Sequence, residues 1–340
     1  MQFRNILVRA PNWVGDAVMS VPALQALRTR FPEAHISILA HPSVSGLYER
    51  ERFCGEVIVY RRGQGIRRLR DIWRAAADLR RRKFDCAILL PNSFESAAIV
   101  RLTGIRVRIG YSRDSRALLL SHPIPVPSPG ETPRHQRFYY LELLKRARLI
   151  ESYSPDSPVR LSPAISSPAA ARVIGVSPGA AYGGAKRWLP ERFAEAAVRI
   201  ARERDASVAV FGSRQEIVVC EVVSSAIQAA DIACVNFAGQ TTLAEFIERA
   251  AACAVFLTND SGAMHIASAL GVPTVAVFGP TDDEATGPAG TQSRVIRHLV
   301  ECSPCMLREC PIDHRCMTRV PSSLVAETAL TLLAADRQNA

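Results

Sequence analysis

The chain has 340 residues, of which 48% are hydrophobic and 22% charged, and its formal net charge is +10. This composition is typical of a globular protein long enough for two domains, and it excludes a disordered chain. No apolar run reaches the length of a membrane span, and Arg9 and Asp16 interrupt the only apolar stretch that could serve as a secretory signal. We therefore expect a cytoplasmic protein.

Strand-like and helix-like segments alternate along the first half. Continuous apolar runs such as CAILL are typical of strands buried on both faces, which indicates a parallel sheet. The pattern predicts strands near 6–9, 36–40, 57–60, 85–90 and 107–110, and helices that include 17–30 and 72–82.

The segment 61–83 carries much of the positive charge. It contains nine arginines and one lysine against two aspartates, a local charge of +8. One interpretation is a solvated helix face; the other is a docking surface for nucleic acid, anionic lipid or an anionic glycolipid. Since Trp73 is its only aromatic residue, with Phe84 directly after it, single-stranded nucleic acid is disfavoured, and we expect no nucleic-acid partner. Five residues of this segment are assigned to a patch that would contact the membrane or a glycolipid acceptor: Arg67, Arg68, Arg70, Arg81 and Arg82.

A serine- and proline-rich segment, 151–168, separates the two halves. Its four prolines and six serines predict a linker or hinge between domains at 1–155 and 165–340. The second half repeats the alternating α/β pattern. Strands are expected near 173–176, 208–211, 234–236, 255–258 and 274–278, and helices near 190–203, 215–227, 242–252, 263–269 and 322–333. Two doubly wound domains would leave a ligand cleft at the carboxyl ends of their strands.

Three loops after predicted strands could carry chemistry. Pro11–Ala17 contains Asp16, which is either a helix N-cap or a general base. Ser177–Trp188 is rich in glycine and alanine and ends near Lys186, which is either a solvated lysine or a point charge for a diphosphate. Phe256–Pro280 holds the NDSG turn, whose Asp260 or Ser261 either caps a helix or helps to bind phosphate at the helix N-terminus. His265 in the next turn either reaches the ligand or is a core histidine.

Four of the nine cysteines lie close together in sequence. One CxxC followed by two more thiols permits a closed structural zinc site, and reduced thiols packing a local loop are the alternative. The cluster consists of Cys302, Cys305, Cys310 and Cys316.

Taken together, the motifs resemble those of the heptosyltransferases of glycosyltransferase family 9. The motifs are APNWVGDAVMSVPAL near the start, LLPNSFESA at 89–97, PGAAYGGAKRW at 178–188, FGS at 211–213, AGQTTLAE at 238–245 and TNDSGAMHIASALGVPTVAVFGPT at 258–281. The PNWVGD and PNSF wording is more similar to type II members than to type I.

The resemblance implies a GT-B fold, with two Rossmann-like domains facing a central cleft. It implies an inverting, metal-independent transfer of the second heptose from ADP-heptose to the lipopolysaccharide inner core (heptosyl-Kdo2-lipid A), without a cofactor. A type I or other family 9 transferase is the alternative, and a nucleotide-sugar epimerase is the alternative from another class. The acceptor would bind the N-terminal domain. From the basic segment 61–83, and not from the resemblance, we expect the protein to make peripheral contact with the anionic cytoplasmic face of the inner membrane.

The resemblance also implies roles for individual residues. Asp16 matches the family's catalytic aspartate, and Lys186 matches the lysine that binds the donor phosphates. The nucleotide-binding turn matches Asp260, Ser261, Gly262 and His265; Gly179 and Tyr182 lie on the matching donor loop; and Gly15, Asn92 and Ser93 are expected where phosphate or acceptor approaches.

Overall fold

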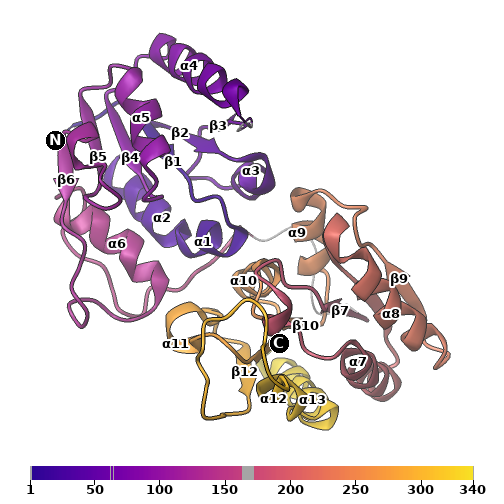
Figure 1. Ribbon diagram of the computed structural model, residues 1–340. Coiled ribbons are helices and arrows are strands. Elements are labelled where there is room, and N and C mark those ends of the chain that lie inside the picture. Colours follow the sequence, from indigo (N-terminus) through magenta and orange to yellow (C-terminus); the bar gives the residue numbers. More distant parts are fainter. Residues whose placement is uncertain (1, 62, 64, 163–171, 340) are drawn as a thin grey trace. The chain divides into compact units, whose positions relative to one another are not determined.

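A computed structural model describes residues 2–61, 63, 65–162 and 172–339. The chain divides into two compact units, Met1–Ser162 and Pro163–Ala340. Among the described residues, no helix is both long and apolar enough to cross a lipid bilayer. Each unit is a layered α/β structure, which confirms the predicted fold class (Figure 1).

The first unit is built on a six-stranded parallel sheet in the order β3-β2-β1-β4-β5-β6. Its strands are β1 (Asn5–Arg9), β2 (His35–Ala40), β3 (Glu56–Val59), β4 (Cys86–Leu89), β5 (Val107–Tyr111) and β6 (His122–Ile124). Its helices are α1 (Val14–Met19), α2 (Val21–Arg30), α3 (Pro42–Tyr48), α4 (Ile66–Arg81), α5 (Phe94–Leu102) and α6 (Gln136–Arg146). Helices α4 and α5 cover one face of the sheet, whereas α1, α2, α3 and α6 pack together on the other.

The second unit repeats this plan with the order β12-β11-β10-β7-β8-β9, again all parallel. Its strands are β7 (Val173–Ser177), β8 (Ser207–Val210), β9 (Cys234–Asn236), β10 (Val255–Asn259), β11 (Thr274–Phe278) and β12 (Ser293–Arg297). Its helices are α7 (Pro190–Arg204), α8 (Ile217–Gln228), α9 (Leu243–Ala251), α10 (Gly262–Ala269), α11 (Asp283–Thr286), α12 (Arg315–Thr318) and α13 (Ser322–Asn339). Helices α7, α8 and α13 share one face, and α9 and α10 share the other.

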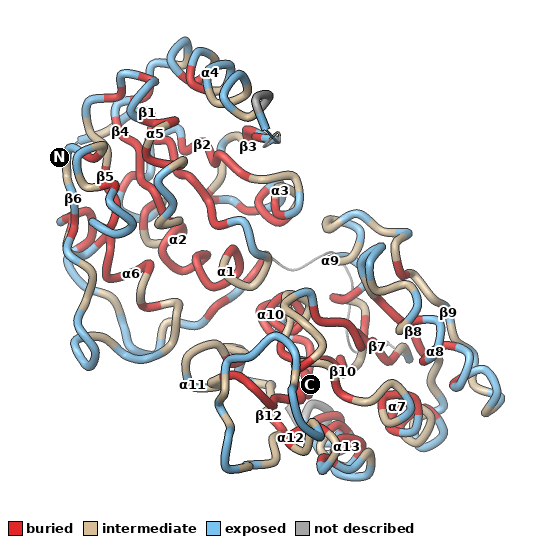
Figure 2. Tube along the Cα trace, in the orientation of Figure 1, coloured by how far each residue is buried: buried red, intermediate tan, exposed pale blue. Residues whose placement is uncertain are grey.

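The central strands of both sheets are buried along most of their length (Figure 2). On one face of the second sheet, four aromatic rings, Phe211, Phe237, Phe246 and Phe256, pack with centroids 5.3–6.1 Å apart. Gly175 on β7 lets this cluster approach, because a Cβ there would clash with the ring of Phe256. Burial on both faces explains why the strands appear in the sequence as continuous apolar runs.

The structure corrects three details of the sequence analysis. The helix expected at 17–30 is two helices, α1 and α2, which meet at Ser20. Pro22 is the second residue of α2, in the first turn, where a helix tolerates proline. Strands β6 and β12 were missed because HPI and SRVIR lack an apolar run. The first part of the predicted linker packs on the first unit: Val159 and Leu161 are buried, and Ser162 binds Glu51 through N–H and Oγ at 2.8 and 3.2 Å. Residues 163–168 lie outside the described part.

In each unit the strand order reverses between the two central strands, β1 and β4 or β7 and β10. The crevice at such a switch point, beyond the carboxyl ends of the strands, is where doubly wound sheets bind ligands. The three loops predicted to carry chemistry, and the segment that contains Asn92 and Ser93, follow these four strands. They are 11–17 after β1, 91–93 after β4, 178–188 after β7 and 260–265 after β10.

Candidate active site

Asp16 is the third residue of α1, and the residue is partly exposed. The N-cap position belongs to Trp13, so the interpretation of Asp16 as an N-cap is wrong. Its Oδ1 accepts a hydrogen bond of 3.0 Å from the hydroxyl of Tyr140 on α6. The first turn of a helix favours a negative charge, so this position suits an ionised carboxylate that is still reachable from solvent.

Tyr140 is buried, and burial raises its pKa well above the ordinary value, with the charge of Asp16 as the next cause. The phenol therefore stays protonated and remains a hydrogen-bond donor to Asp16 over the physiological pH range. Sequence reasoning missed Tyr140, because 124 residues separate it from Asp16 and the YY pair in α6 resembles ordinary core sequence.

Two buried arginines hold the loops that follow β1 and β4. Arg9, at the end of β1, donates from Nη2 to Asn12 Oδ1 at 2.7 Å. Arg116 is fully buried and donates to the carbonyls of Pro91 and Tyr111 and, at 3.3 Å, to Asn92 Oδ1. Desolvation lowers the pKa of each arginine to about 10. Both loops begin with Pro-Asn, a repetition that could have signalled this shared construction.

Asn92 and Ser93 thus have local structural roles in the described chain. Asn92 Nδ2 donates to the hydroxyl of Tyr139 at 2.8 Å, and Ser93 is the N-cap of α5, accepting from the N–H of Ser96. The neighbouring tyrosines of α6 therefore contact both loops, Tyr139 through Asn92 and Tyr140 through Asp16. Contact of Asn92, Ser93 and Gly15 with phosphate or with the acceptor stays a prediction.

The second unit joins Lys186 to the NDSG turn. Lys186 Nζ lies 2.5 Å from Asp260 Oδ2, and the side chains are 12% and 5% exposed. The interpretation of Lys186 as a solvated loop lysine is therefore wrong. Asp260 Oδ2 also accepts from Thr281 Oγ1 at 2.6 Å, so the carboxylate is fixed from two sides. The pair places an ammonium group at the switch point of this sheet, where a phosphate would bind.

Asn259 secures the glycine-rich loop beside this pair. Its side chain is fully buried; Oδ1 accepts from the N–H of Trp188, and Nδ2 donates to the carbonyl of Pro178 at 2.7 Å. Gly179 lies so close to the Glu216 carboxylate that a Cβ would clash with it. The ring of Tyr182 lies 4.7 Å from Lys186 Nζ, a cation–π distance. The sequence places Asn259 in the NDSG turn but does not indicate this anchoring role.

Ser261 is the N-cap of α10, which begins at Gly262, and its side chain accepts from the N–H of Met264. His265 lies in the first turn of this helix and is buried, with 6% exposure. The capping interpretation of Ser261 is confirmed, and a cap leaves the remaining first-turn N–H groups directed at the crevice. Contact of His265 with a ligand stays a prediction.

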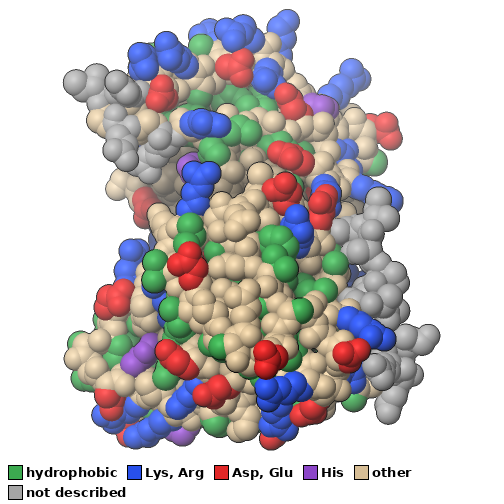
Figure 3. All heavy atoms as spheres, turned by 90° about the vertical axis from the view of Figure 1, so that its right-hand side faces the viewer, with side chains coloured by type: hydrophobic (Ala, Val, Ile, Leu, Met, Phe, Trp, Pro, Cys, Tyr) green, Lys and Arg blue, Asp and Glu red, His purple; other side chains and the backbone are tan. Residues whose placement is uncertain are grey.

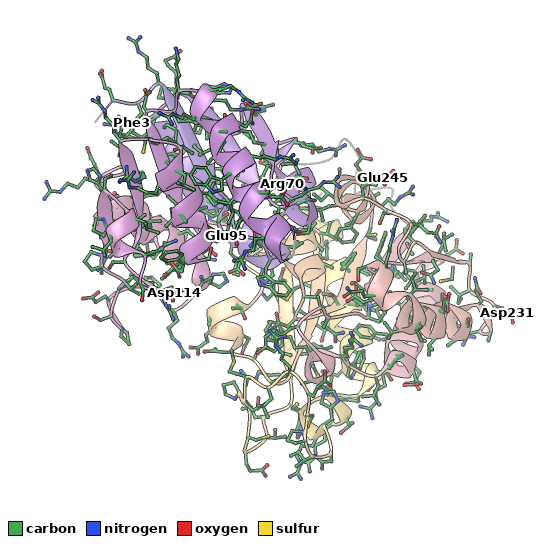
Figure 4. All side chains as sticks on the ribbon, turned by 45° about the horizontal axis from the view of Figure 1, so that its top comes forward. Phe3, Arg70, Glu95, Asp114, Asp231 and Glu245 are labelled. Atoms are coloured by element: carbon green, nitrogen blue, oxygen red, sulfur yellow. The ribbon has the colours of Figure 1, made fainter. Side chains whose placement is uncertain are left out.

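The predicted arginine patch is partly neutralised. Arg68 Nε lies 2.6 Å from Glu95 Oε2, Arg82 pairs with Glu56 at 2.5 Å, and Arg81 pairs with Asp78 at 3.0 Å. Figure 4 shows Arg70 on α4 and Glu95 at the start of α5. Arg70 is mostly exposed and lies 4.0 Å from Asp71. The side chain of Arg67 lies outside the described part.

The described residues hold no group of three or more histidines, cysteines or acidic residues arranged to bind a metal ion, so the structure does not support the zinc site. Cys302, Cys305, Cys310 and Cys316 form no disulfide. They lie near one another: burial raises the pKa of the Cys316 thiol, and the other three thiols raise it further.

Comparison with known proteins identifies the family of this chain. The model of glycosyltransferase family 9 (heptosyltransferase) matches residues 72–315. The chain belongs to glycosyltransferase family 9. Lipooligosaccharide heptosyltransferase 2 of Haemophilus ducreyi is 32% identical over 86% of this chain and 88% of that protein. Lipopolysaccharide heptosyltransferase 2 of Salmonella typhimurium is 33% identical over 86% and 87%. The solved structure of E. coli ADP-heptose LPS heptosyltransferase II has a TM-score of 0.82 and 28% identity, covering 99% of this chain and all of the other.

Proposed function

We propose that this family 9 glycosyltransferase moves a heptose from ADP-heptose to the heptose-bearing inner core of lipopolysaccharide, with inversion at the anomeric carbon. The relatives named heptosyltransferase 2 support the donor, the acceptor and the type II assignment. The observation that carries the proposal is the buried Lys186–Asp260 pair beside the N-terminus of α10, because it places a cation and free amides where a diphosphate can bind.

Asp16 acts as the general base. Its carboxylate takes the proton of the acceptor hydroxyl as that oxygen forms its bond to the anomeric carbon. The hydrogen bond from Tyr140 orients the carboxylate, and its partly exposed position admits a hydroxyl group. General-base help of this kind contributes about 10²–10⁴-fold to the rate.

The bond between the anomeric carbon and the ADP oxygen breaks as the new bond forms, and ADP leaves with the electron pair. Lys186 and the N–H groups at the start of α10 stabilise the charge that grows on the departing diphosphate. Because Asp260, itself held by Thr281, already fixes the Lys186 ammonium group, that group needs little reorganisation at that moment.

The exposed face of α4 supplies the membrane contact. Leu69 and Trp73 lie one helical turn apart and are 64% and 63% exposed, next to the exposed Arg70 and Arg74. In Figure 3, Lys and Arg side chains gather along the upper edge of the displayed face. Aromatic and aliphatic side chains flanked by arginine suit the interface of an anionic membrane, where the glycolipid acceptor resides. Trp73→Ser should therefore weaken binding to anionic vesicles, whereas Val218→Ser, an exposed control on α8, should not.

Product analysis tests the proposed reaction. We expect purified protein, ADP-heptose and a heptosyl-Kdo2-lipid A acceptor to yield free ADP and a product heavier by one heptose in mass spectrometry. An acceptor that lacks the first heptose should gain no mass. Transfer to the heptose-free acceptor alone would favour type I specificity, and an epimerised donor without transfer would refute the proposal.

A further inference from the structure

The cysteine-rich segment 302–316 packs against the donor loop. The hydroxyl of Tyr182 donates to the carbonyl of Met306 at 2.8 Å, and the N–H of Ala185 donates to the carbonyl of Arg308 at 2.9 Å. These contacts join positions more than 120 residues apart, and both lie just before Lys186 in the loop. The segment therefore borders the loop that carries the ammonium group.

Two side chains of the segment complete this contact. Glu309 Oε1 accepts from the N–H of Gly184 at 2.9 Å, and His314 Nε2 donates to the carbonyl of Ala185 at 2.8 Å. Together these bonds hold the backbone of the one-turn helix η3 (Gly184–Lys186), which ends at Lys186. A carboxylate that accepts from a backbone N–H makes a stronger hydrogen bond than a neutral acceptor, so Glu309 is the most important of these contacts.

The glycines of the loop fit this contact. A Cβ at Gly183 would clash with the backbone carbonyl of Arg308, and one at Gly184 would clash with the carboxylate of Glu309. The loop thus uses residues without side chains where the segment approaches. This explains the Gly-Gly pair more specifically than a general need for a thin ligand loop.

The segment is itself anchored at both ends. Ser303 Oγ donates to the carbonyl of Gly279 at 2.5 Å, and the N–H of Met306 donates to the carbonyl of Pro280 at 2.8 Å. Both carbonyls lie just after β11. At the other end, Cys316 and Met317 of α12 are buried in the core of the second unit. A chain fixed at both ends can transmit rigidity to the loop that rests on it.

We propose that the segment 302–316 is a brace for the donor loop, in which Glu309 and His314 are positioning residues that hold Lys186 for the donor diphosphate. The identity of that ligand rests on the proposed function. Arg308 adds to the site, because its guanidinium lies 5.3 Å from the centroid of the Tyr182 ring that Lys186 also contacts. The brace gives the cysteine-rich segment a role that requires no metal ligation by its thiols.

Hydrogen exchange of the free protein tests the brace without any ligand. Glu309→Ala should speed exchange of the amides in 183–187 by about tenfold, because Gly184 loses its acceptor. Glu309→Gln should restore protection, since its amide oxygen accepts the same bond. Glu301→Ala is the matched control: this carboxylate directly precedes the segment, is 83% exposed and pairs with Arg315 instead. Unchanged exchange in Glu309→Ala would overturn the brace.

ADP binding by calorimetry tests the positioning role. We expect the Kd for ADP to rise about five- to tenfold in Glu309→Ala and His314→Ala, to stay within about twofold in Glu309→Gln, and to be unchanged in Glu301→Ala. Faster exchange with unchanged ADP affinity would overturn the positioning role. If the wild type binds no ADP, the proposed function fails, while the exchange experiment still decides whether the brace exists.

Discussion

The two units share one strand order and carry their candidate site residues after equivalent strands, yet they hold these loops in different ways. In the first unit, long buried side chains reach up from the core: Arg9 and Arg116 bind the Pro-Asn loops, and Tyr140 binds Asp16. In the second unit, the short side chain of Asn259 and direct backbone contacts from the segment 302–316 hold the loop of Lys186.

The difference matches the chemistry proposed for each unit. A general base needs one carboxylate held in a defined direction, and a single buried phenol can do this. A diphosphate site needs backbone N–H groups close to the ligand, which requires a loop of glycine and alanine that must be supported from behind. The comparison predicts that damage to the second unit alters donor binding and that damage to the first alters the chemical step.

Lys186→Ala should have the largest effect on donor chemistry. Loss of the ammonium group removes charge compensation for ADP and leaves Asp260 buried at 5% exposure without its cation. We expect kcat/KM for ADP-heptose to fall by about 10²–10³. Lys186→Arg should restore part of the charge. Steady-state kinetics with an unchanged donor KM and kcat would contradict the role of this lysine.

Arg116→Met should destabilise the first unit while sparing the second. The substitution removes the donor to the carbonyl of Pro91 and one of the two donors to that of Tyr111, which keeps the N–H of Arg113; we expect a loss of about 3 kcal/mol in unfolding free energy. Urea unfolding, followed by fluorescence and by ADP binding, should show the first unit unfolding earlier. If ADP binding is lost at the same urea concentration as the structure of the first unit, the two units unfold together, which contradicts this prediction.

Asn259→Ala is the counterpart in the second unit. It removes the acceptor of the Trp188 N–H and the donor to Pro178, so we expect a loss of about 2 kcal/mol in unfolding free energy and weaker ADP binding. Calorimetric titration with ADP provides the measurement. A variant that binds ADP as tightly as the wild type would mean that Asn259 does not position the loop.

Tyr140→Phe should have the smallest effect. Loss of one hydrogen bond to a carboxylate is expected to lower kcat about tenfold, with the donor KM unchanged, because the base loses its orientation. The raised pKa of Tyr140 also predicts that its ionisation does not limit the wild-type rate on the alkaline side. Single-turnover rates measured against pH check both statements, and a raised donor KM with normal kcat would contradict them.

The sequence revealed the two-unit α/β plan and the four loops, because buried parallel strands and glycine-rich turns leave local patterns. It did not reveal Tyr140, Arg9 or Arg116. Their roles depend on contacts between distant parts of the chain, and in the sequence each residue occupies what looks like an ordinary core or surface position. It also overestimated the free charge of α4, because Glu56 and Glu95, the partners of Arg82 and Arg68, lie outside the basic segment. The role of 302–316 was missed because backbone carbonyls carry much of its contact with the donor loop.

The measurement that tests the account most directly is the rate of heptose transfer by Asp16→Asn, together with its affinity for ADP. The variant keeps the shape of the side chain and can still bind Tyr140, but it cannot accept the acceptor's proton. We predict a rate lower by about 10²–10⁴ with unchanged ADP affinity. Transfer at the wild-type rate would show that another group removes the proton, and would contradict the central claim.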